Sequence, residues 1–339
     1  MGRLEFTLLG RFEARRNGRS ISTGPEPRKP VELLCYLLVF DERPHHRELL
    51  ADQLWAGSTT SQSRKYLRQA LWQLQRLFGL PAVQPDPLLI LDHEWIQLNA
   101  RADRWLDIDE VERAYACVKG IPGEDMDRGQ AHCIKDAVSL YRADLLEGWY
   151  QDWVVFERER LKTMYLAMLE RLLAYSERRR EVEDGLRYGG LILQHDRAHE
   201  RTHWRMMRLH SLAGDRTGAM RQFNRCVAAL DEELGVKPSD RTLRLHERIR
   251  DDLPIDEGDG TPRTPRPEPT LPRHDAKTGG ADDSTGRHRG TGSIRLSGQL
   301  ANIQQTVARV ERLVEQDLEM TRVISRRDRR DRPPRSHPA

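Results

Sequence analysis

The segment between Ser61 and Phe78, SQSRKYLRQALWQLQRLF, gathers the side chains with the most distinctive chemistry in this sequence. Its apolar residues recur at helical spacing and predict one amphipathic helix of about five turns. The core-facing stripe would consist of Leu67, Ala70, Leu71, Leu74, Leu77 and Phe78. The opposite face carries Arg, Lys and Gln and no acid, and such side chains can bond guanine and adenine edges in a major groove. An ordinary solvated helix face explains the same composition, so the neighbouring elements must decide between the two interpretations.

Those neighbouring elements predict a small αβ unit. Alternating apolar residues over 4–8 predict a strand, and 12–16 and 19–22 a hairpin around the turn Asn17-Gly18. Helices are expected over 30–40 and 46–55, with Leu49 among the inward residues of the second. Ser61 or Ser63 is expected to cap the helix at 61–78. Apolar runs at 88–91 and 95–98, separated by Asp92-His93-Glu94, predict a second hairpin.

Three segments of this unit resemble a known family. RKPVELLCYLLV, HRELLADQLW and LRQALWQLQRLFG are similar to the Streptomyces antibiotic regulatory protein (SARP) family of transcriptional activators. The resemblance implies a winged helix-turn-helix of response-regulator type over residues 1–100, whose third helix enters the major groove. It also implies a set of DNA-binding residues on that helix: Arg64, Lys65, Arg68, Gln69, Trp72, Gln73 and Arg76. The first two lie near the helix start and could also hold phosphates.

Two features of this unit leave alternatives open. The expected wing tip, Asp92-His93-Glu94, carries two acids, which face phosphates unfavourably. Either the wing sits off the DNA, or Arg101 and Arg104 beyond it make the contact. Trp72 could stack on a sugar or a thymine methyl group, and it could equally pack on a neighbouring domain.

Residues 101–253 predict an all-α domain. Helices are expected over 106–119, 131–140, 153–178, 182–195, 199–213, 216–234 and 239–252, and their Gly-Asp junctions suggest a tetratricopeptide-like repeat. Two stretches, YRADLLEGW and MMRLHSLAGDRTGAMRQFNRCVAALDEELGVKPSDRTLRLHERI, resemble the bacterial transcriptional activation domain that follows the winged helix in SARP-type proteins.

The sequence offers little for catalysis or metal binding. It contains no GxxxxGK loop and no serine elbow. His195, His199 and His203 recur every four residues, but a helix starting near Asp196 would leave the first outside, and exposed polar histidines explain the pattern better. Three glutamates lie among arginines at helical spacing and are expected to form surface ion pairs: Glu157, Glu159 and Glu170.

Four cysteines are scattered without metal-finger or redox spacing: Cys35, Cys117, Cys133 and Cys226. Reduced thiols of this kind fit the cytoplasm. We therefore expect no catalytic residue, no cofactor and no metal, and the chain is not expected to be an enzyme.

The last 86 residues fall into three segments of different composition. Residues 254–293 are rich in Pro, Gly, Thr, Asp and Arg and predict a disordered linker. Within 294–327, an apolar seam predicts an amphipathic helix, which could form a homodimeric coiled coil or dock on another surface: Leu296, Leu300, Ile303, Val307, Val310 and Val314. Residues 328–339 form a basic tail. The sequence has no apolar run long enough for a membrane span.

Together these patterns predict a mainly α protein with a small β component. It would be a sequence-specific, DNA-binding transcriptional activator that reads the major groove with the helix at 61–78. The expected partners are double-stranded DNA, RNA polymerase holoenzyme and a second copy of the chain, without a membrane, in the cytoplasm at the nucleoid. The alternative is a helical-repeat interaction scaffold whose winged helix no longer binds DNA. The acidic wing tip and the net charge of only +2 over residues 1–100 favour this alternative.

Overall fold

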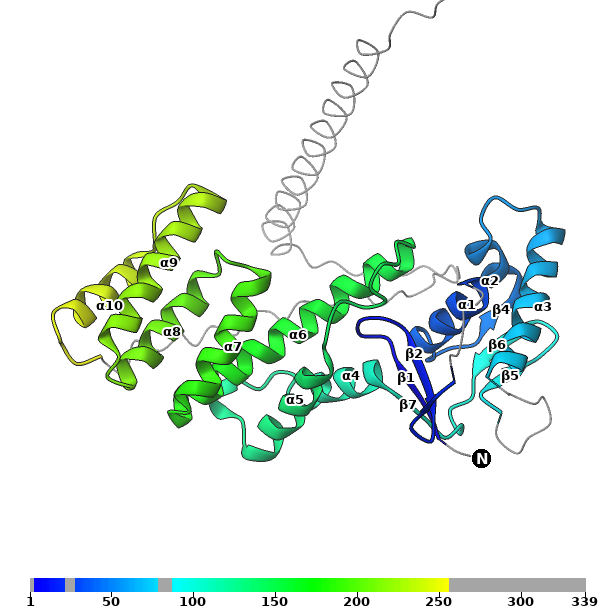
Figure 1. Cartoon of the computed structure of the whole chain (residues 1–339), viewed down its shortest axis with the longest axis horizontal. Coiled ribbons are helices and arrows are strands. Elements are labelled where there is room, and N and C mark those ends of the chain that lie inside the picture. The colour runs from blue at the N-terminus through cyan, green and yellow to red at the C-terminus, as the bar shows by residue number, and fades with distance from the viewer. Residues whose placement is uncertain (1–2, 22–27, 79–86, 256–339) are drawn as a thin grey trace, which may run out of the picture. The chain divides into compact units, whose positions relative to one another are not determined.

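The computed structural model describes residues 3–21, 28–78 and 87–255, and every structural statement below concerns these ranges. They are mainly helical with two small sheets, as the sequence predicts (Figure 1). The predicted linker from Pro254 onward lies almost entirely outside the described residues, and so do the helix at 294–327 and the basic tail. Within the described ranges, no helix combines the length and the apolar character that a membrane crossing needs.

The first sheet joins the N-terminal strands to a strand from far along the chain. Its order is β3-β2-β1-β7, with β1 at Leu4–Thr7, β2 at Glu13–Arg16, β3 at Arg19–Ser20 and β7 at Arg104–Leu106. Asn17 and Gly18 have φ values of 51° and 74°, which suit the tight turn expected between β2 and β3. Strand β7 was not predicted, and it pairs with β1 in parallel beyond the expected domain boundary at residue 100.

Three helices and a hairpin follow in the expected order. They are α1 at Arg28–Val39, α2 at Arg47–Leu54, α3 at Thr60–Leu77, and strands β5 at Leu89–Leu91 and β6 at Trp95–Leu98. A short strand β4, His45–His46, adds to β6 and makes a second sheet of three strands. The predicted burial of Leu49 is wrong: this side chain is 70% exposed, because Leu50, Ala51 and Leu54 fill the buried side of α2.

A capping box begins α3. The Thr59 hydroxyl accepts a hydrogen bond from the Gln62 backbone N–H at 3.4 Å, and the Gln62 side chain accepts one from the Thr59 N–H at 3.3 Å. This arrangement satisfies two amide donors that the first turn cannot pair internally. The expected cap at Ser61 or Ser63 is therefore wrong by two or more positions, and Ser63 is instead buried.

The remaining residues form a helical domain. Its elements are α4 at Asp107–Cys117, the 3-10 turn η1 at Gly123–Asp125, α5 at Arg128–Leu140, α6 at Asp152–Arg179, α7 at Val182–His195, α8 at Glu200–Leu212, α9 at Arg216–Leu234 and α10 at Asp240–Arg250. From α6 to α10 each helix packs on the next (Figure 1). Gly189 lets α7 approach α8 closely, since a Cβ there would lie 2.6 Å from the Met206 sulfur.

Asp107 joins the helical domain to the first sheet. Its carboxylate accepts hydrogen bonds from the backbone N–H groups of Leu8 and Leu9, both at 2.8 Å, and of Ile108 at 2.9 Å. Burial raises the pKa of Asp107 to about 6, although the N–H donors act to lower it. Between about pH 4 and 6 the folded protein thus holds a proton that the unfolded chain has lost. This contribution to stability accordingly falls as the pH rises through that window.

The loop between α5 and α6 contacts the same end of β1. Leu146 donates its N–H to the Leu8 carbonyl at 2.8 Å, and Gly10 donates to the Asp144 carbonyl at 3.0 Å. The Arg158 guanidinium holds this loop in shape by donating to the carbonyl oxygens of Leu145, Leu146 and Trp149, at 2.9 to 3.2 Å. The motif YRADLLEGW therefore has a structural role here, as the segment that fixes the helical domain to β1.

An aromatic contact adds to this junction. The Trp153 ring at the start of α6 lies edge-on to Tyr36 at 5.4 Å and to Phe40 at 6.0 Å, and both partners come from α1 or its end. Edge-to-face geometry at these centroid distances is favourable.

We predict that Asp107→Ala lowers the free energy of unfolding by about 2–4 kcal/mol, because the buried backbone N–H groups of Leu8 and Leu9, just after β1, lose their acceptor. Asp107→Asn keeps one side-chain oxygen and should cost clearly less. Chemical denaturation of both variants measures the difference. Equal losses would mean that the carboxylate oxygens do not hold β1.

We predict that Thr59→Ala lowers the free energy of unfolding by about 1 kcal/mol through loss of the cap. Ser61→Ala, two positions further into the helix, is the matched control and should be nearly neutral. Thermal melts of the two proteins compare them. A larger shift for Ser61→Ala would move the cap back to the position expected from the sequence.

Candidate nucleic-acid interface

The exposed side of α3 carries most of the predicted DNA-binding residues. Gln73 is half-buried. The other six are exposed: Arg64, Lys65, Arg68, Gln69, Trp72 and Arg76. The helix contains no Asp or Glu. Lys65, Gln69, Trp72 and Arg76 follow one another at spacings of three or four residues and so share one face. We call these four residues the α3 face.

Apolar contacts on its other side fix α3 in place. Leu67, Ala70, Leu71 and Leu74 are buried, as the sequence predicts. At the end of the helix the Phe78 ring lies edge-on to Phe6 at 6.3 Å and to Phe12 at 6.5 Å. The first sheet thus anchors the C-terminal end of the helix, and the α3 face is held on a rigid base.

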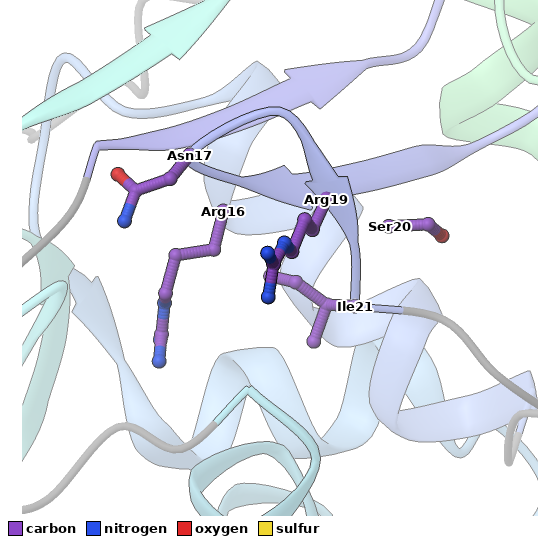
Figure 2. Close-up of a pocket in the computed structure, with 5 residues that line it drawn as sticks. All are labelled: Arg16, Asn17, Arg19, Ser20 and Ile21. Carbon is purple, nitrogen blue, oxygen red and sulfur yellow. The ribbon is translucent and has the colours of Figure 1, made fainter.

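A hollow beside the β2–β3 turn belongs to this anchor. Figure 2 shows its lining, Arg16, Asn17, Arg19, Ser20 and Ile21. The Arg16 guanidinium donates a hydrogen bond to the Phe78 carbonyl at the end of α3. A cation is favourable there because the last carbonyls of a helix carry partial negative charge. We therefore interpret the hollow as part of the support for α3.

The cations on α3 differ in what surrounds them. Arg64 forms an exposed ion pair with Glu48 of α2. Lys65 and Arg68 form no ion pair with any described residue. The contact between Glu48 and Arg64 was not predictable from spacing, because sixteen positions separate the two and only the packing of α2 on α3 joins them.

Trp72 and Arg76 contact each other. The Arg76 guanidinium carbon lies 4.9 Å from the centroid of the Trp72 ring, within the range of cation–π attraction. Trp72 is 54% exposed. Of the two alternatives for this tryptophan, packing on a neighbouring domain does not occur among the described residues, and the side chain is open to an external partner.

The hairpin β5–β6 has the two acids at its tip. Asp92 donates its N–H to the Trp95 carbonyl at 2.9 Å, and the Glu94 carbonyl accepts from the N–H of Arg47 at 2.8 Å, which ties the tip to α2. Of the cations considered as substitutes for a basic tip, Arg104 is engaged by Asp41 and Asp109 and only 12% of its side chain is exposed. Arg101, by contrast, is exposed.

The histidine pattern does not gather into a metal site. His195 ends α7 and His199 precedes α8, so the expectation that a helix starts near Asp196 is wrong. His203 is buried, with both ring nitrogens engaged, by the Arg197 carbonyl at 2.9 Å and by the Gln222 side-chain nitrogen at 2.7 Å. Burial lowers its pKa and favours the neutral ring. Among the described residues, no group of three or more His, Cys, Asp or Glu could hold a metal ion.

One expected surface ion pair is a buried one. Glu157 pairs with Arg160 three residues away, as the spacing predicts, but Glu157 is only 9% exposed. Arg160 also contacts Glu112 of α4, so the cluster joins α4 to α6. Sequence spacing located the partner but not the burial, which depends on the packing of a distant helix.

Two of the scattered cysteines lie next to each other. The Cys117 and Cys133 side chains are hydrogen-bonded between α4 and α5, and burial raises the pKa of Cys133. Cys35 and Cys226 are fully buried, as expected for small apolar side chains. No spacing rule could have paired Cys117 with Cys133, because the loop between α4 and α5 sets their distance.

Comparison with known proteins gives two findings. Residues 106–250 match the family described as bacterial transcriptional activator domain. Among solved structures, the chain is similar to Mycobacterium tuberculosis EmbR in complex with a low affinity phosphopeptide. The TM-score is 0.55 at 19% identity, over 76% of this chain and 67% of that chain. No curated protein matches the sequence.

At 19% identity the likeness to EmbR establishes a shared fold. The family match carries the functional information, and it begins at the C-terminal end of β7, one residue before Asp107. The match over residues 106–250 associates this part of the chain with the regulation of transcription.

Proposed function

We propose that this protein binds double-stranded DNA through a winged helix-turn-helix at residues 1–100 and activates transcription. One observation carries the proposal: α3 has no acid, and its exposed face combines cations with an amide and an indole. Helices α2 and α3 would form the helix-turn-helix, with α3 in the major groove.

The residues on α3 would divide their roles by chemistry. Gln69 and Arg76 have the forked donors and acceptors that match adenine and guanine edges. Lys65 and Arg68 are exposed and unpaired, so they are suited to phosphates or bases. Arg64 near the helix start would exchange Glu48 for a phosphate.

The helical domain would contact RNA polymerase holoenzyme and mediate self-association. Helices α6 to α10 pack in series, as the tetratricopeptide-like interpretation predicts, and such arrays present extended surfaces to protein partners. Two associated protomers that bind repeated half-sites together would hold the DNA more tightly than one protomer alone. The proposed location is the cytoplasm, at the nucleoid, and no membrane takes part.

A second candidate function is an interaction scaffold whose winged helix no longer binds DNA. The exposed acids at the hairpin tip and the pairing of Arg64 with Glu48 favour it. Binding to random duplex DNA separates the two functions, since a DNA-binding protein loses affinity steeply as salt rises and a scaffold shows no such slope.

We predict that Arg76→Ala and Gln69→Ala each weaken binding to a selected DNA site by about 5-fold to 100-fold, as expected for loss of a base contact. Both side chains are exposed, so folding should be unaffected. Arg221→Ala, an exposed arginine on α9, is the matched control for lost charge. Gel-shift titrations measure the affinities. Unchanged binding in both α3 variants would refute the role assigned to this face.

We predict that Glu48→Gln strengthens binding to random duplex DNA several-fold at low salt, because it removes a negative charge and frees Arg64 for a phosphate. The slope of log affinity against log salt should steepen by about one. Glu147→Gln, an exposed glutamate in the loop before α6, controls for net charge. Equal gains in the two variants would show that net charge alone, and not the Arg64 pair, is responsible.

A further inference from the structure

Trp72 and Arg76 lie one helical turn apart and form a cation–π pair on the exposed side of α3. The guanidinium carbon of Arg76 is 4.9 Å from the centroid of the indole ring, and the indole is 54% exposed. No acidic side chain lies on this helix, so the aromatic ring takes the place that a carboxylate often occupies beside an arginine.

An arginine held against an aromatic ring and an arginine paired with a carboxylate differ in how many of their N–H donors stay free. A cation–π contact attracts the guanidinium charge to the ring face and engages no N–H donor in a hydrogen bond to an acceptor atom. Glu48 instead accepts one N–H of Arg64, from its Nη2. Reading guanine requires two in-plane N–H donors directed at O6 and N7. Of these two arginines, Arg76 therefore keeps its donors available to a base edge, whereas Arg64 has one of its donors engaged.

Contact with the indole ring also restricts where the Arg76 guanidinium can point. A free arginine loses rotamer freedom when it binds, and a side chain held beforehand loses less. The Trp72 ring is itself carried by a helix that is fixed by buried leucines and by Phe78. The position of the Arg76 guanidinium is thus set by a rigid support.

We infer that Trp72 is a positioning residue that holds Arg76 to recognise a guanine at one base pair of the DNA site. The inference rests on the proposed function, and it adds the base that is read and the residue that sets the preference. Trp72 itself need not touch DNA. Its neutral ring should contribute to base discrimination and not to phosphate attraction.

The test starts from a DNA site selected from a random duplex library by the full-length protein. Affinities are then measured for the selected site, for each single-base-pair variant of it and for random duplex DNA. The proteins compared are the wild type, Trp72→Leu, Trp72→Phe, Arg76→Ala and the double variant Trp72→Leu/Arg76→Ala. Phenylalanine keeps a π face, whereas leucine keeps only apolar bulk.

We expect Arg76→Ala to remove the guanine preference at one position, which amounts to roughly 5-fold to 150-fold in affinity. Trp72→Leu should reduce the preference at that same position by about 3-fold to 10-fold. Trp72→Phe should retain most of it, and the double variant should be no worse than Arg76→Ala. Affinity for random DNA should be the same for Trp72→Leu and the wild type.

Three results would overturn the inference while leaving DNA binding intact. They are an unchanged preference in Trp72→Leu, a change at a base pair other than the one that depends on Arg76, and an Arg76-dependent base that is not guanine. A different result, in which the wild type selects no site and shows no salt-sensitive binding, would refute the proposed function itself. Circular dichroism melts of Trp72→Leu and Trp72→Phe verify that both variants are folded before the comparison.

Discussion

The buried carboxylate of Asp107 is the interaction on which the rest of the structure depends. It binds the backbone N–H groups at the end of β1 and stands at the first position of α4, so one side chain fixes both the first sheet and the helical domain. A charge with 1% exposure is costly unless several donors surround it, and three backbone N–H groups do so here. Strand β7 pairs in parallel with β1, and the loop at 141–149 forms hydrogen bonds with the residues just after β1. Both therefore attach to a part of the first sheet that Asp107 holds in place.

This junction joins the activator domain to the part of the chain that carries α3. Trp153 contacts α1, and α1 packs on α3, so a series of side-chain contacts connects the start of α6 to the helix that carries the α3 face. Displacing either part would leave the N–H groups of Leu8 and Leu9 without their acceptor and would remove the aromatic contact. Backbone hydrogen bonds and aromatic rings therefore hold the two parts together.

The α3 face illustrates how a helix surface gains specificity from its neighbours. The residue types of α3 are ordinary for a solvated helix, and the four cations of the whole helix would be equivalent if it stood alone. Packing of α2 on α3 brings Glu48 to Arg64, while the four-residue spacing within α3 brings Trp72 next to Arg76. One arginine is thereby committed to a carboxylate and another is presented with its donors free. These environments, and not the composition, distinguish the residues.

The sequence by itself determined the element types, because they depend on local periodicity. The amphipathic stripe of α3, the Asn17-Gly18 turn and the helices α7 and α9 lie where apolar spacing and turn residues place them. The family resemblance was also legible in contiguous motifs, and the match over 106–250 supports it. Tertiary structure alone decided the strand β7, the exposure of Leu49, the cap at Thr59 and the burial of Glu157. Each of these depends on which distant backbone or side chain occupies the neighbouring space. Periodicity states which face of an element is apolar, but it carries no information about what that face, or the polar one, will meet.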